Sequence, residues 1–317
     1  IKVYFNFKDV KKILSKKVYY CINGISGIDG LEPTLIIIKF CKNIAIANKE
    51  SIICGWKFIK EKLNKHNTKF LPIDSEHFST WTLLKGENIY NVDRIFLTAS
   101  GGPFLKKKSS IVNNAKPIYA LKHPNWNMGK KISIDSATMM NKVFEIIEAK
   151  RIFDLPVSKF NILIHPNSYI HSIIKFNNGI IKILAHDTSM EIPIINTLYK
   201  SEDVYNFTTK KVDYNKLNKL ELAKPKISQF PTLKLIKLIP NKFTYFETIL
   251  ITINDVLVYK YLNNEITFSS IYNYLNRLIK LPYFNKYYAK SPRNLNDIKI
   301  MISIVKDKIK YFFENAK

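Results

Sequence analysis

The sequence predicts an α/β protein made of a partial Rossmann-like parallel sheet, a central α/β catalytic domain and a C-terminal helical domain. Three observations support this: strands and helices alternate near the N-terminus, a pair of carboxylates follows a strand, and helical periodicity dominates the last part of the 317-residue chain. The expected organisation is the remaining part of a nucleotide-binding domain over residues 1–74, a metal and substrate domain over 75–205, a linker over 206–231 and a helical domain over 232–317.

The N-terminal part has the pattern of a βαβ unit. Apolar Val18–Asn23 predicts a buried strand, and a glycine-containing turn leads from it into a helix from about Glu32 to Phe40. The next strand is expected over Asn43–Asn48, so the two strands should lie parallel with a right-handed crossover. A helix over Ser51–Asn64 and a strand over Phe70–Asp74 continue the alternation.

The rest of the chain changes from mixed to helical. Strands are expected over Ile95–Thr98 and Phe160–Ile164, with a helix over Met139–Phe153. A polar stretch through the 200s and 210s is followed by Pro225 and Pro231, which are typical of a linker. The remainder has helical periodicity with a surface rich in lysine and tyrosine.

Bulk composition limits the possible partners. The formal net charge is +25, but only four of the 50 basic residues are arginines, and the lysines are scattered along the whole length. A nucleic-acid-binding face should cluster its charges and favour arginine, so we expect no nucleic-acid partner and keep a basic nucleic-acid-binding protein as the weakest alternative. No run approaches the roughly 20 apolar residues of a membrane span. Cys21, Cys41 and Cys54 form no CxxC motif, which fits a reducing compartment.

Two carboxylates follow the strand expected over 70–74. Asp74 and Glu76 are two residues apart, so on an extended segment both side chains would leave the same face and reach one cation. Glu145, on another element, is the candidate for a third oxygen ligand. Three carboxylates together need a divalent ion or protons to offset their repulsion, and oxygen-only ligands favour Mg²⁺ or Mn²⁺ over zinc. For an isolated Asp-x-Glu pair, a solvated acidic turn is the ordinary alternative.

Longer motifs surround this pair. They cover Gly24–Leu35, Ala45–Ser51, Thr98–Phe104, Ala120–Lys131 and Ile164–Ser172. In their order along the chain and in their residues, these motifs resemble the 1-deoxy-D-xylulose 5-phosphate reductoisomerase family, from about residue 20 to about residue 200. The C-terminal third is similar mainly in its helical character.

The resemblance implies an activity and its partners. The reaction would convert 1-deoxy-D-xylulose 5-phosphate into 2-C-methyl-D-erythritol 4-phosphate, for non-mevalonate isoprenoid precursor biosynthesis, by rearrangement of the carbon skeleton and reduction by NADPH. The metal would be Mg²⁺ or Mn²⁺, with Co²⁺ as a further candidate. The implied partners are a sugar phosphate and a second copy in a homodimer, with no membrane partner. The implied location is the cytoplasm of a bacterium or endosymbiont, or a plastid-type organelle.

The resemblance also implies a role for individual residues. The metal ligands would be Asp74, Glu76 and Glu145, and the catalytic residues would be Lys49, Glu76 and His123. The substrate would contact Lys49, Ser75, Glu76, Ser100, His123, Ser136, Asn141, Lys142 and Glu145. NADPH would contact Asn48, Glu50, Gly129 and Met190. Residues 123–131 would form a mobile flap in which Trp126 covers the substrate and excludes water.

Some of these roles stay open on the residues alone. Ser136, expected at the start of a helix, is either a phosphate donor or simply an N-cap serine. His77, His165 and His171 are alternatives to His123 for proton transfer, although lone histidines are commonly structural. His165 and His171 would share a face if their segment is extended.

The dinucleotide fingerprint is not found. Gly24, Gly27 and Gly30 have G-x-x-G-x-x-G spacing instead of G-x-G-x-x-G. In the resembled family a glycine-rich turn near the N-terminus holds the dinucleotide phosphates, so we interpret the chain as the downstream part of a longer protein. We expect weak NADPH binding and negligible NADPH oxidation by this chain alone. The alternative function is a cofactor-incompetent relic that still binds metal and sugar phosphate. Departures from the family pattern around Met190 and at Thr252–Asp255 leave the cofactor contact and the docking of the helical domain open.

Overall fold

The computed structural model describes residues 7–199 and 211–315. Its N-terminal sheet consists of β1 (Val18–Asn23), β2 (Cys41–Ile46) and β3 (Lys69–Leu71), which pair in parallel in that order. The predicted parallel βαβ unit is therefore confirmed. The third strand is shorter than expected because Pro72, which has no N–H, follows Leu71.

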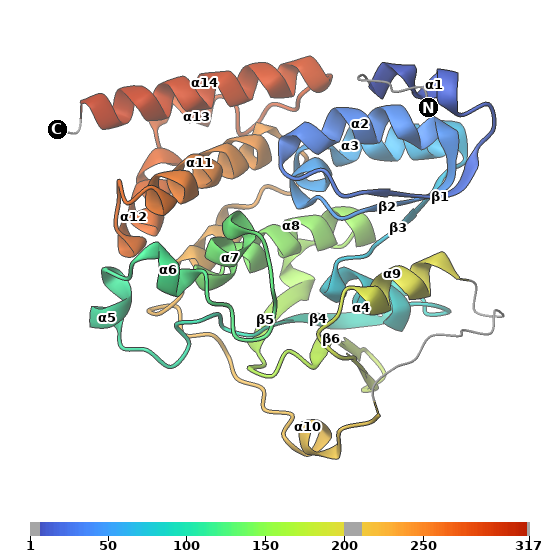
Figure 1. Cartoon of the computed structure of the whole chain (residues 1–317), viewed down its shortest axis with the longest axis horizontal. Coiled ribbons are helices and arrows are strands. Elements are labelled where there is room, and N and C mark those ends of the chain that lie inside the picture. Colours follow the sequence, from blue (N-terminus) through green and yellow to red (C-terminus); the bar gives the residue numbers. More distant parts are fainter. Residues whose placement is uncertain (1–6, 200–210, 316–317) are drawn as a thin grey trace.

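Two helices lie together on one side of this sheet (Figure 1). The first, α2 (Leu31–Ile37), continues as a 3-10 turn over Ile38–Phe40, and the second is α3 (Lys49–His66). The Asn48 side chain caps α3, because its Oδ1 accepts a hydrogen bond from the Ser51 amide at 2.7 Å. This cap fixes the start of the helix that carries Lys49.

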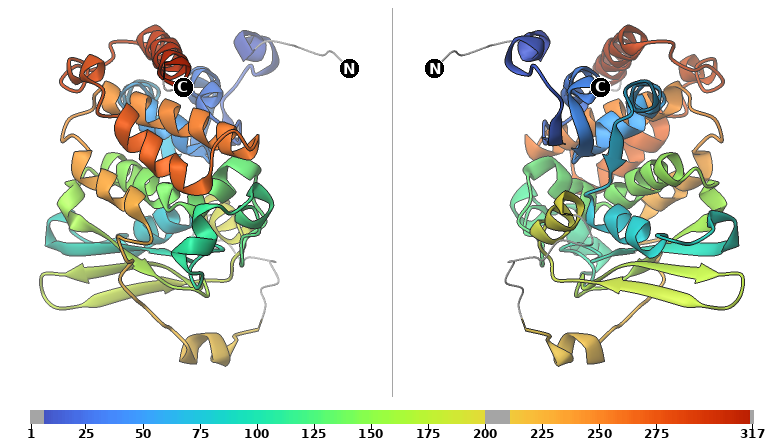
Figure 2. Two further views of the ribbon diagram at one scale, coloured as in Figure 1. Left: turned by 90° about the vertical axis from the view of Figure 1, so that its left-hand side faces the viewer. Right: turned by 90° about the vertical axis from the view of Figure 1, so that its right-hand side faces the viewer.

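A second, mixed sheet lies in the lower half of the molecule in Figure 1. Its strands are β4 (Val92–Ala99), β5 (Phe160–Ile164), β6 (Ile170–Phe176) and β7 (Ile181–Ala185), in the spatial order β5-β4-β6-β7. Strands β4 and β5 are parallel, whereas β6 pairs antiparallel with both β4 and β7. Figure 2 shows β6 and β7 in the lower part of the molecule, on the opposite side from the C-terminal helices.

Between β3 and β5 the chain forms three helices of eight or more residues. They are α4 (Ser75–Leu83), α7 (Lys130–Ala137) and α8 (Met140–Phe153). Helix α8 runs through the middle of the molecule in Figure 1 and is buried at every position from Lys142 to Lys150. Charged side chains on this helix must therefore find partners inside the protein.

The C-terminal part is helical, as predicted. It contains the 3-10 helix η6 (Pro231–Leu238) and the helices α11 (Tyr245–Leu262), α12 (Phe268–Leu278), α13 (Pro282–Asn285) and α14 (Leu295–Glu314). A reciprocal capping box of Thr244 and Glu247 starts α11. This part is docked on the rest of the molecule: Asn254 Nδ2 donates to Asp135 Oδ1 at 2.8 Å, and Lys299 lies 2.7 Å from Glu32.

The remaining elements are short. They are η1 (Phe7–Asp9), α1 (Val10–Ile13), η2 (Ile28–Gly30), η4 (Ile89–Asn91), α5 (Ser109–Asn113), α6 (Pro117–Ala120), η5 (Val157–Lys159), α9 (Glu191–Leu198) and α10 (Tyr214–Asn218).

The first residues of the predicted linker, and the end of the domain expected before it, fall partly outside the described residues. The part that is described contains helix α10, which was not predicted, and Ala223 forms a β-bridge with Ile164. Gln229 also donates to the carbonyl groups of Phe104 and Leu105. None of the helices in residues 7–199 and 211–315 is long and apolar enough to cross a membrane.

Candidate metal and substrate site

Asp74 and Glu76 lie at the start of a helix. The expectation of an extended segment is wrong, because β3 ends at Leu71 and Asp74 is the N-cap of α4. The Asp74 Oδ1 atom accepts a hydrogen bond from the Glu76 amide at 3.3 Å. Both carboxylates still reach one place, since the first helical turn carries them side by side, and the helix N-terminus favours their negative charge.

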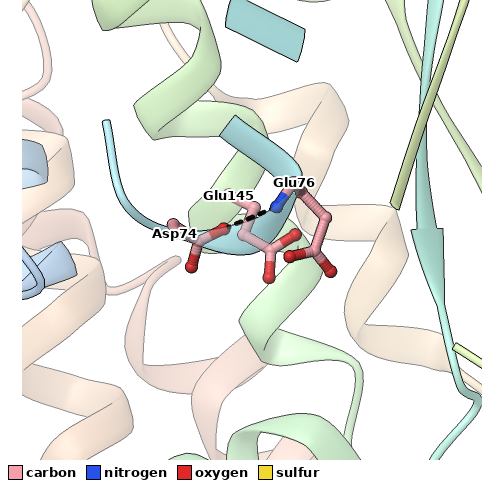
Figure 3. A group of neighbouring side chains, drawn as sticks. All are labelled: Asp74, Glu76 and Glu145. Carbon is pink, nitrogen blue, oxygen red and sulfur yellow. Dashed lines mark hydrogen bonds between the residues drawn. The ribbon is translucent and has the colours of Figure 1, made fainter. Parts of the chain in front are cut away.

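Glu145 meets this pair from the second turn of α8. Asp74, Glu76 and Glu145 each offer an oxygen, and these oxygens all lie within 4.8 Å of one another. Figure 3 shows the three carboxyl groups next to one another. The side chains are 22%, 14% and 0% exposed, respectively, so the cluster is buried on the α8 side and partly open on the α4 side.

Two buried lysines balance the carboxylates. Lys49 Nζ donates to Asp74 Oδ2, and Lys142 Nζ donates to Glu76 Oε1 and, at 2.6 Å, to Glu145 Oε2. Lys49 Nζ also lies 3.9 Å from Glu145 Oε1. In the absence of other cations, these ammonium groups offset the carboxylate repulsion.

This pairing sets the titration of the cluster. Burial opposes ionisation of Asp74, but Lys49 and then His77 hold the pKa of Asp74 well below its usual range. Burial and the neighbouring Glu76 together raise the pKa of Glu145 to about 8. Burial alone would lower the pKa of Lys142, but Glu145 and Glu76 raise it. The lysines therefore stay charged at neutral pH, whereas Glu145 holds a proton in most molecules.

Beside the carboxylates lies a group of hydroxyl and amide donors. Ser100 follows β4 and precedes Gly101 and Gly102, which have φ values of 84° and 66°. A side chain at Gly102 would place its Cβ 3.1 Å from Ala137 Cα, so this left-handed turn requires glycine. Ser136 lies next to this turn, because its carbonyl oxygen would be 3.2 Å from a Cβ at Gly102.

The position of Ser136 differs from the prediction. It lies in the last turn of α7, not at the start of a helix, so the N-cap alternative is wrong. Asn141 and Lys142 do lie in the first turn of α8. The Asn141 Nδ2 atom donates to Glu145 Oε1, while its Oδ1 is buried with no hydrogen-bond partner among the described residues.

His123 begins a loop that lines the same cavity as the carboxylate cluster. Its Nδ1 accepts hydrogen bonds from the Asn125 amide at 3.2 Å and the Trp126 amide at 3.0 Å, so the ring proton is on Nε2 and points to Ser100 Oγ at 2.9 Å. Burial, and then the charge of Lys142, lower the pKa of His123 to about 4. His123 is therefore neutral at physiological pH.

The other histidines differ in position. His77 Nε2 donates to the Glu145 carbonyl at 2.9 Å and His165 Nδ1 donates to the Glu221 carbonyl at 2.8 Å, and both rings are buried. His171 faces Trp126, with ring centroids 6.3 Å apart. His165 and His171 do not share one extended segment, because the turn at Ser168 (φ 50°) separates β5 from β6.

These residues enclose a cavity of about 260 Å³. Its lining includes every substrate and metal residue expected from the sequence, together with Met190, with His171, which was an alternative for proton transfer, and with Ser168, which was not predicted. These predicted residues are Lys49, Asp74, Ser75, Glu76, Ser100, His123, Ser136, Asn141, Lys142 and Glu145.

A second cavity of about 770 Å³ adjoins the first, because Lys49, Ile132 and Asn141 line both. It contains the predicted cofactor residues Asn48, Glu50 and Gly129, but not Met190. The Asn48 amide is already bonded to the Ile25 and Gly27 carbonyl groups. Asn48 thus shapes the glycine-containing loop that forms one wall.

Two sets of charged residues were not anticipated. Glu148 lies one turn beyond Glu145 on α8, only 1% exposed, with Lys49 Nζ at 3.6 Å. Spacing along the helix could have identified it, since residues three apart share a face. The second set surrounds Lys131 and joins elements far apart in the sequence, so no local signal marks it.

Family models and relatives agree with this geometry. The chain matches the models described as "1-deoxy-D-xylulose 5-phosphate reductoisomerase" over residues 1–55, "1-deoxy-D-xylulose 5-phosphate reductoisomerase C-terminal domain" over 70–153 and "DXP reductoisomerase C-terminal domain" over 186–307. It is 50% identical over 311 residues to the 1-deoxy-D-xylulose 5-phosphate reductoisomerase of Pelagibacter ubique (strain HTCC1062), covering 98% of this chain and 80% of the relative. The chain belongs to the 1-deoxy-D-xylulose 5-phosphate reductoisomerase family.

Other members of the reductoisomerase family are similar over much of the chain. The protein of Sulfurihydrogenibium sp. (strain YO3AOP1) is 37% identical over 286 residues, with 90% of this chain and 75% of the relative covered. A solved reductoisomerase from Zymomonas mobilis in complex with NADPH superimposes with a TM-score of 0.84 at 29% identity, covering 97% of this chain and 78% of that one. A DOX-P reductoisomerase in complex with NADPH, fosmidomycin and magnesium superimposes with a TM-score of 0.85 at 30% identity, covering 93% of this chain and 75% of that one.

Proposed function

We infer that this protein converts 1-deoxy-D-xylulose 5-phosphate into 2-C-methyl-D-erythritol 4-phosphate, as an NADPH-dependent reductoisomerase that needs a divalent metal ion. The observation that carries this conclusion is the three-carboxylate cluster, which lies in a cavity with hydroxyl, amide and ammonium donors in a chain of this family. Carboxylates for a metal ion and donors for a phosphate are the two groups of contacts that such a substrate needs.

The residues present fit a divalent ion. Oxygen-only ligands suit Mg²⁺ and Mn²⁺, and the mutual distances of up to 4.8 Å allow Asp74, Glu76 and Glu145 to share one ion. The magnesium complexes of related reductoisomerases support this choice. When bound, the ion would polarise the substrate carbonyl and orient its vicinal oxygens, and NADPH would supply the hydride.

The chain's own side chains have separate tasks. We propose that Lys49 and Ser75 bind the oxygenated carbons of the substrate, because both line the cavity next to the carboxylates. Ser100, Ser136, Asn141 and Lys142 would bind the phosphate, with the turn at Gly101 supplying backbone donors. Neutral His123, with its proton on Nε2, would donate to a substrate oxygen in place of Ser100 Oγ.

The loop over residues 122–129 would exclude water during the reaction. Trp126 is half-buried against His171 and lines the cavity, as does Met128. Asn125 Nδ2 holds the loop to the Pro166 carbonyl at 2.6 Å and Ser168 Oγ at 2.8 Å. A closed loop here would keep solvent from the reactive intermediate and from the hydride transfer.

The larger cavity fits a dinucleotide better than the smaller one does. Its volume is about 770 Å³, and it opens onto the substrate cavity at Lys49 and Asn141. Gly24 and Gly27 border it with no atom within 4 Å of where a Cβ would lie, so backbone groups there are accessible to a ligand. We propose Glu50 and Gly129 as contacts from this cavity and Met190 as a contact from the substrate side.

One pair of measurements tests the function. NADPH oxidation that depends on both 1-deoxy-D-xylulose 5-phosphate and Mg²⁺, with 2-C-methyl-D-erythritol 4-phosphate as product, is the expected result. Mg²⁺-dependent binding of fosmidomycin, measured without NADPH, tests the metal and substrate part separately. Fosmidomycin binding without oxidation would support the relic alternative and the expected weak binding of NADPH. If neither fosmidomycin binding nor NADPH oxidation is observed, the whole proposal is contradicted.

We further propose a homodimer, supported by the edge of the second sheet, where no further strand of residues 7–199 or 211–315 pairs with β7. Strand β7 is the last strand in the order β5-β4-β6-β7, and its Ile181 and Ile183 are 58% and 49% exposed. Exposed apolar edge strands are usually covered by a partner. A reducing compartment of the cytoplasmic or plastid type is also proposed, because Cys21, Cys41 and Cys54 are free thiols.

A further inference from the structure

Lys131 lies where the loop over residues 122–129 joins α7. It is the second residue of that helix, and its side chain is 21% exposed, whereas the neighbouring Lys130 is exposed. Its ammonium group contacts a carboxylate on each of three helices: Glu50 of α3 at 2.6 Å, Asp135 of α7 at 2.9 Å and Asp255 of α11 at 3.1 Å. We call these four residues the Lys131 cluster.

The Lys131 cluster also touches α8 and a second residue of α11. The ammonium lies 5.0 Å from the centre of the Phe144 ring, which is on α8, and Asp135 accepts a hydrogen bond from Asn254 of α11 at 2.8 Å. Burial alone would lower the pKa of Lys131, but Asp135, Asp255 and Glu50 raise it well above its usual value. Lys131 is therefore a permanent cation shared by helices that are far apart in the sequence.

The loop between His123 and Lys131 is held at both ends. At its start, His123 binds the Asn125 and Trp126 amides, and Asn125 binds the Pro166 carbonyl. At its end, the Lys130 side chain forms no hydrogen bond or ion pair with residues 7–199 or 211–315, and a Cβ at Gly129 would meet nothing within 4 Å. The first strong tie after the loop is therefore the Lys131 cluster.

We propose that Lys131 is a positioning residue for the substrate site: by anchoring the end of the loop to α3 and α11, it holds Trp126 and Met128 over the cavity and couples substrate binding to the docking of the C-terminal helices. This inference rests on the proposed function, because it deepens the role of the same loop. Lys131 itself lies in the wall of the larger cavity and not in the substrate cavity. Its influence on substrate binding must therefore pass through the loop.

The expected change in ligand affinity follows from the fraction of molecules in which the loop is in place. If losing the anchor reduces the fraction of molecules with the loop in place to about one tenth, the apparent Kd for a ligand under the loop rises about tenfold. Metal affinity should hardly change, because the Lys131 cluster shares no residue with Asp74, Glu76 or Glu145. A purely structural role would instead lower the melting temperature and leave both affinities unchanged.

The test uses a chain in which Trp56 and Trp81 are replaced by phenylalanine, so that Trp126 alone reports. Two quantities are measured for each variant: quenching of Trp126 by acrylamide without ligand, and the Kd of fosmidomycin in the presence of Mg²⁺. Lys131→Met should increase the quenching and raise the fosmidomycin Kd about tenfold. Lys131→Arg should keep the quenching and the fosmidomycin Kd close to those of the parent chain, since a guanidinium can bind the same carboxylates. Lys130→Met is the matched control and should change neither.

Asp255→Ala keeps the inference testable if Lys131→Met does not fold. It removes only the contact between Lys131 and Asp255, at a partly exposed position, and it should raise the fosmidomycin Kd about threefold. Unchanged quenching and Kd in a folded Lys131→Met or Asp255→Ala variant would overturn the inference. If the parent chain does not bind fosmidomycin, the proposed function fails instead, and the quenching data alone then decide whether the Lys131 cluster anchors the loop.

Discussion

Replacing Glu145 by glutamine tests the proposed metal site most directly. The substitution keeps the shape of a side chain that is fully buried, and it removes one of the three carboxyl groups that can ionise to bind a metal ion. It should not weaken the metal-free fold, because burial and Glu76 already raise the pKa of Glu145 to about 8 and the wild-type group is mostly protonated at neutral pH. A loss of metal binding could therefore not be attributed to unfolding.

The magnitude can be estimated from charges. Two unit charges 4 Å apart interact by about 4 kcal/mol at an effective dielectric constant near 20, and the ion carries two charges. In the wild type, two costs oppose this attraction between the ion and Glu145. Glu145 must lose its proton, and its carboxylate must give up the contact with Lys142 Nζ at 2.6 Å. Since changes to groups around a metal already cost about 10- to 100-fold, we expect roughly a 100-fold loss of Mn²⁺ affinity, or about 2.7 kcal/mol.

Calorimetric titration of Mn²⁺ into both proteins measures this loss. Glu148→Gln is the matched control, because it makes the same change one turn further along α8 at a residue that is 1% exposed and is not part of the cluster. Its Mn²⁺ affinity should stay within about threefold of the wild type. Equal affinities of the wild type and Glu145→Gln would refute the shared site. Equal losses in both variants would assign the effect to general burial of charge on α8.

Three further outcomes are expected. Adding fosmidomycin with Mg²⁺ should change the tryptophan fluorescence, and Trp126→Ala should abolish that part of the change; a signal that persists would contradict the loop assignment. Because the pKa of His123 is lowered to about 4, its neutral form stabilises the loop fully above about pH 6.5, and this contribution is lost as the pH falls through about 4. The fluorescence of Trp126 without ligand should thus change with pH, with a midpoint near pH 4. A midpoint near pH 6.5, or the same pH-dependent change in His123→Asn, would disprove the hydrogen bonds that His123 Nδ1 accepts. Ile183→Lys should convert a dimer to a monomer in sedimentation, while Ile300→Lys, equally exposed on α14, should not; an unchanged dimer would exclude the β7 edge.

The sequence predicts elements best where the signal is local. The β1-α2-β2 unit and α3 follow from apolar runs and from caps such as Asn48, which lie within a few residues of the feature they define. The strand expected over Phe70–Asp74 fails at its end, because Pro72 and the capping tendency of Asp74 favour a turn into α4. Asp74 and Glu76 still meet, since a helix start brings neighbouring side chains together as well as a strand does.

The parts of the site that were mispredicted depend on tertiary contacts. Ser136 was expected at the start of a helix, but the chain ends α7 there and starts α8 only after Met139, which takes a left-handed conformation with φ 62°. A methionine in this conformation is not predictable from its type, because it is held by surrounding packing. The Lys131 cluster likewise needs residues 50, 135 and 255 together, and no sequence spacing relates them.

The charges of the cluster indicate how the site accommodates a phosphorylated substrate. Asp74, Glu76 and a protonated Glu145 carry two negative charges, which Lys49 and Lys142 balance. When a divalent ion displaces the Glu145 proton, the three carboxylates carry three negative charges. The two lysines and the ion carry four positive charges, so the loaded site has one net positive charge. A phosphate group carries about −1.5 to −2 charges at neutral pH, so it complements the loaded site better than the empty one. Metal and sugar phosphate should therefore bind cooperatively, because each lowers the electrostatic cost of the other.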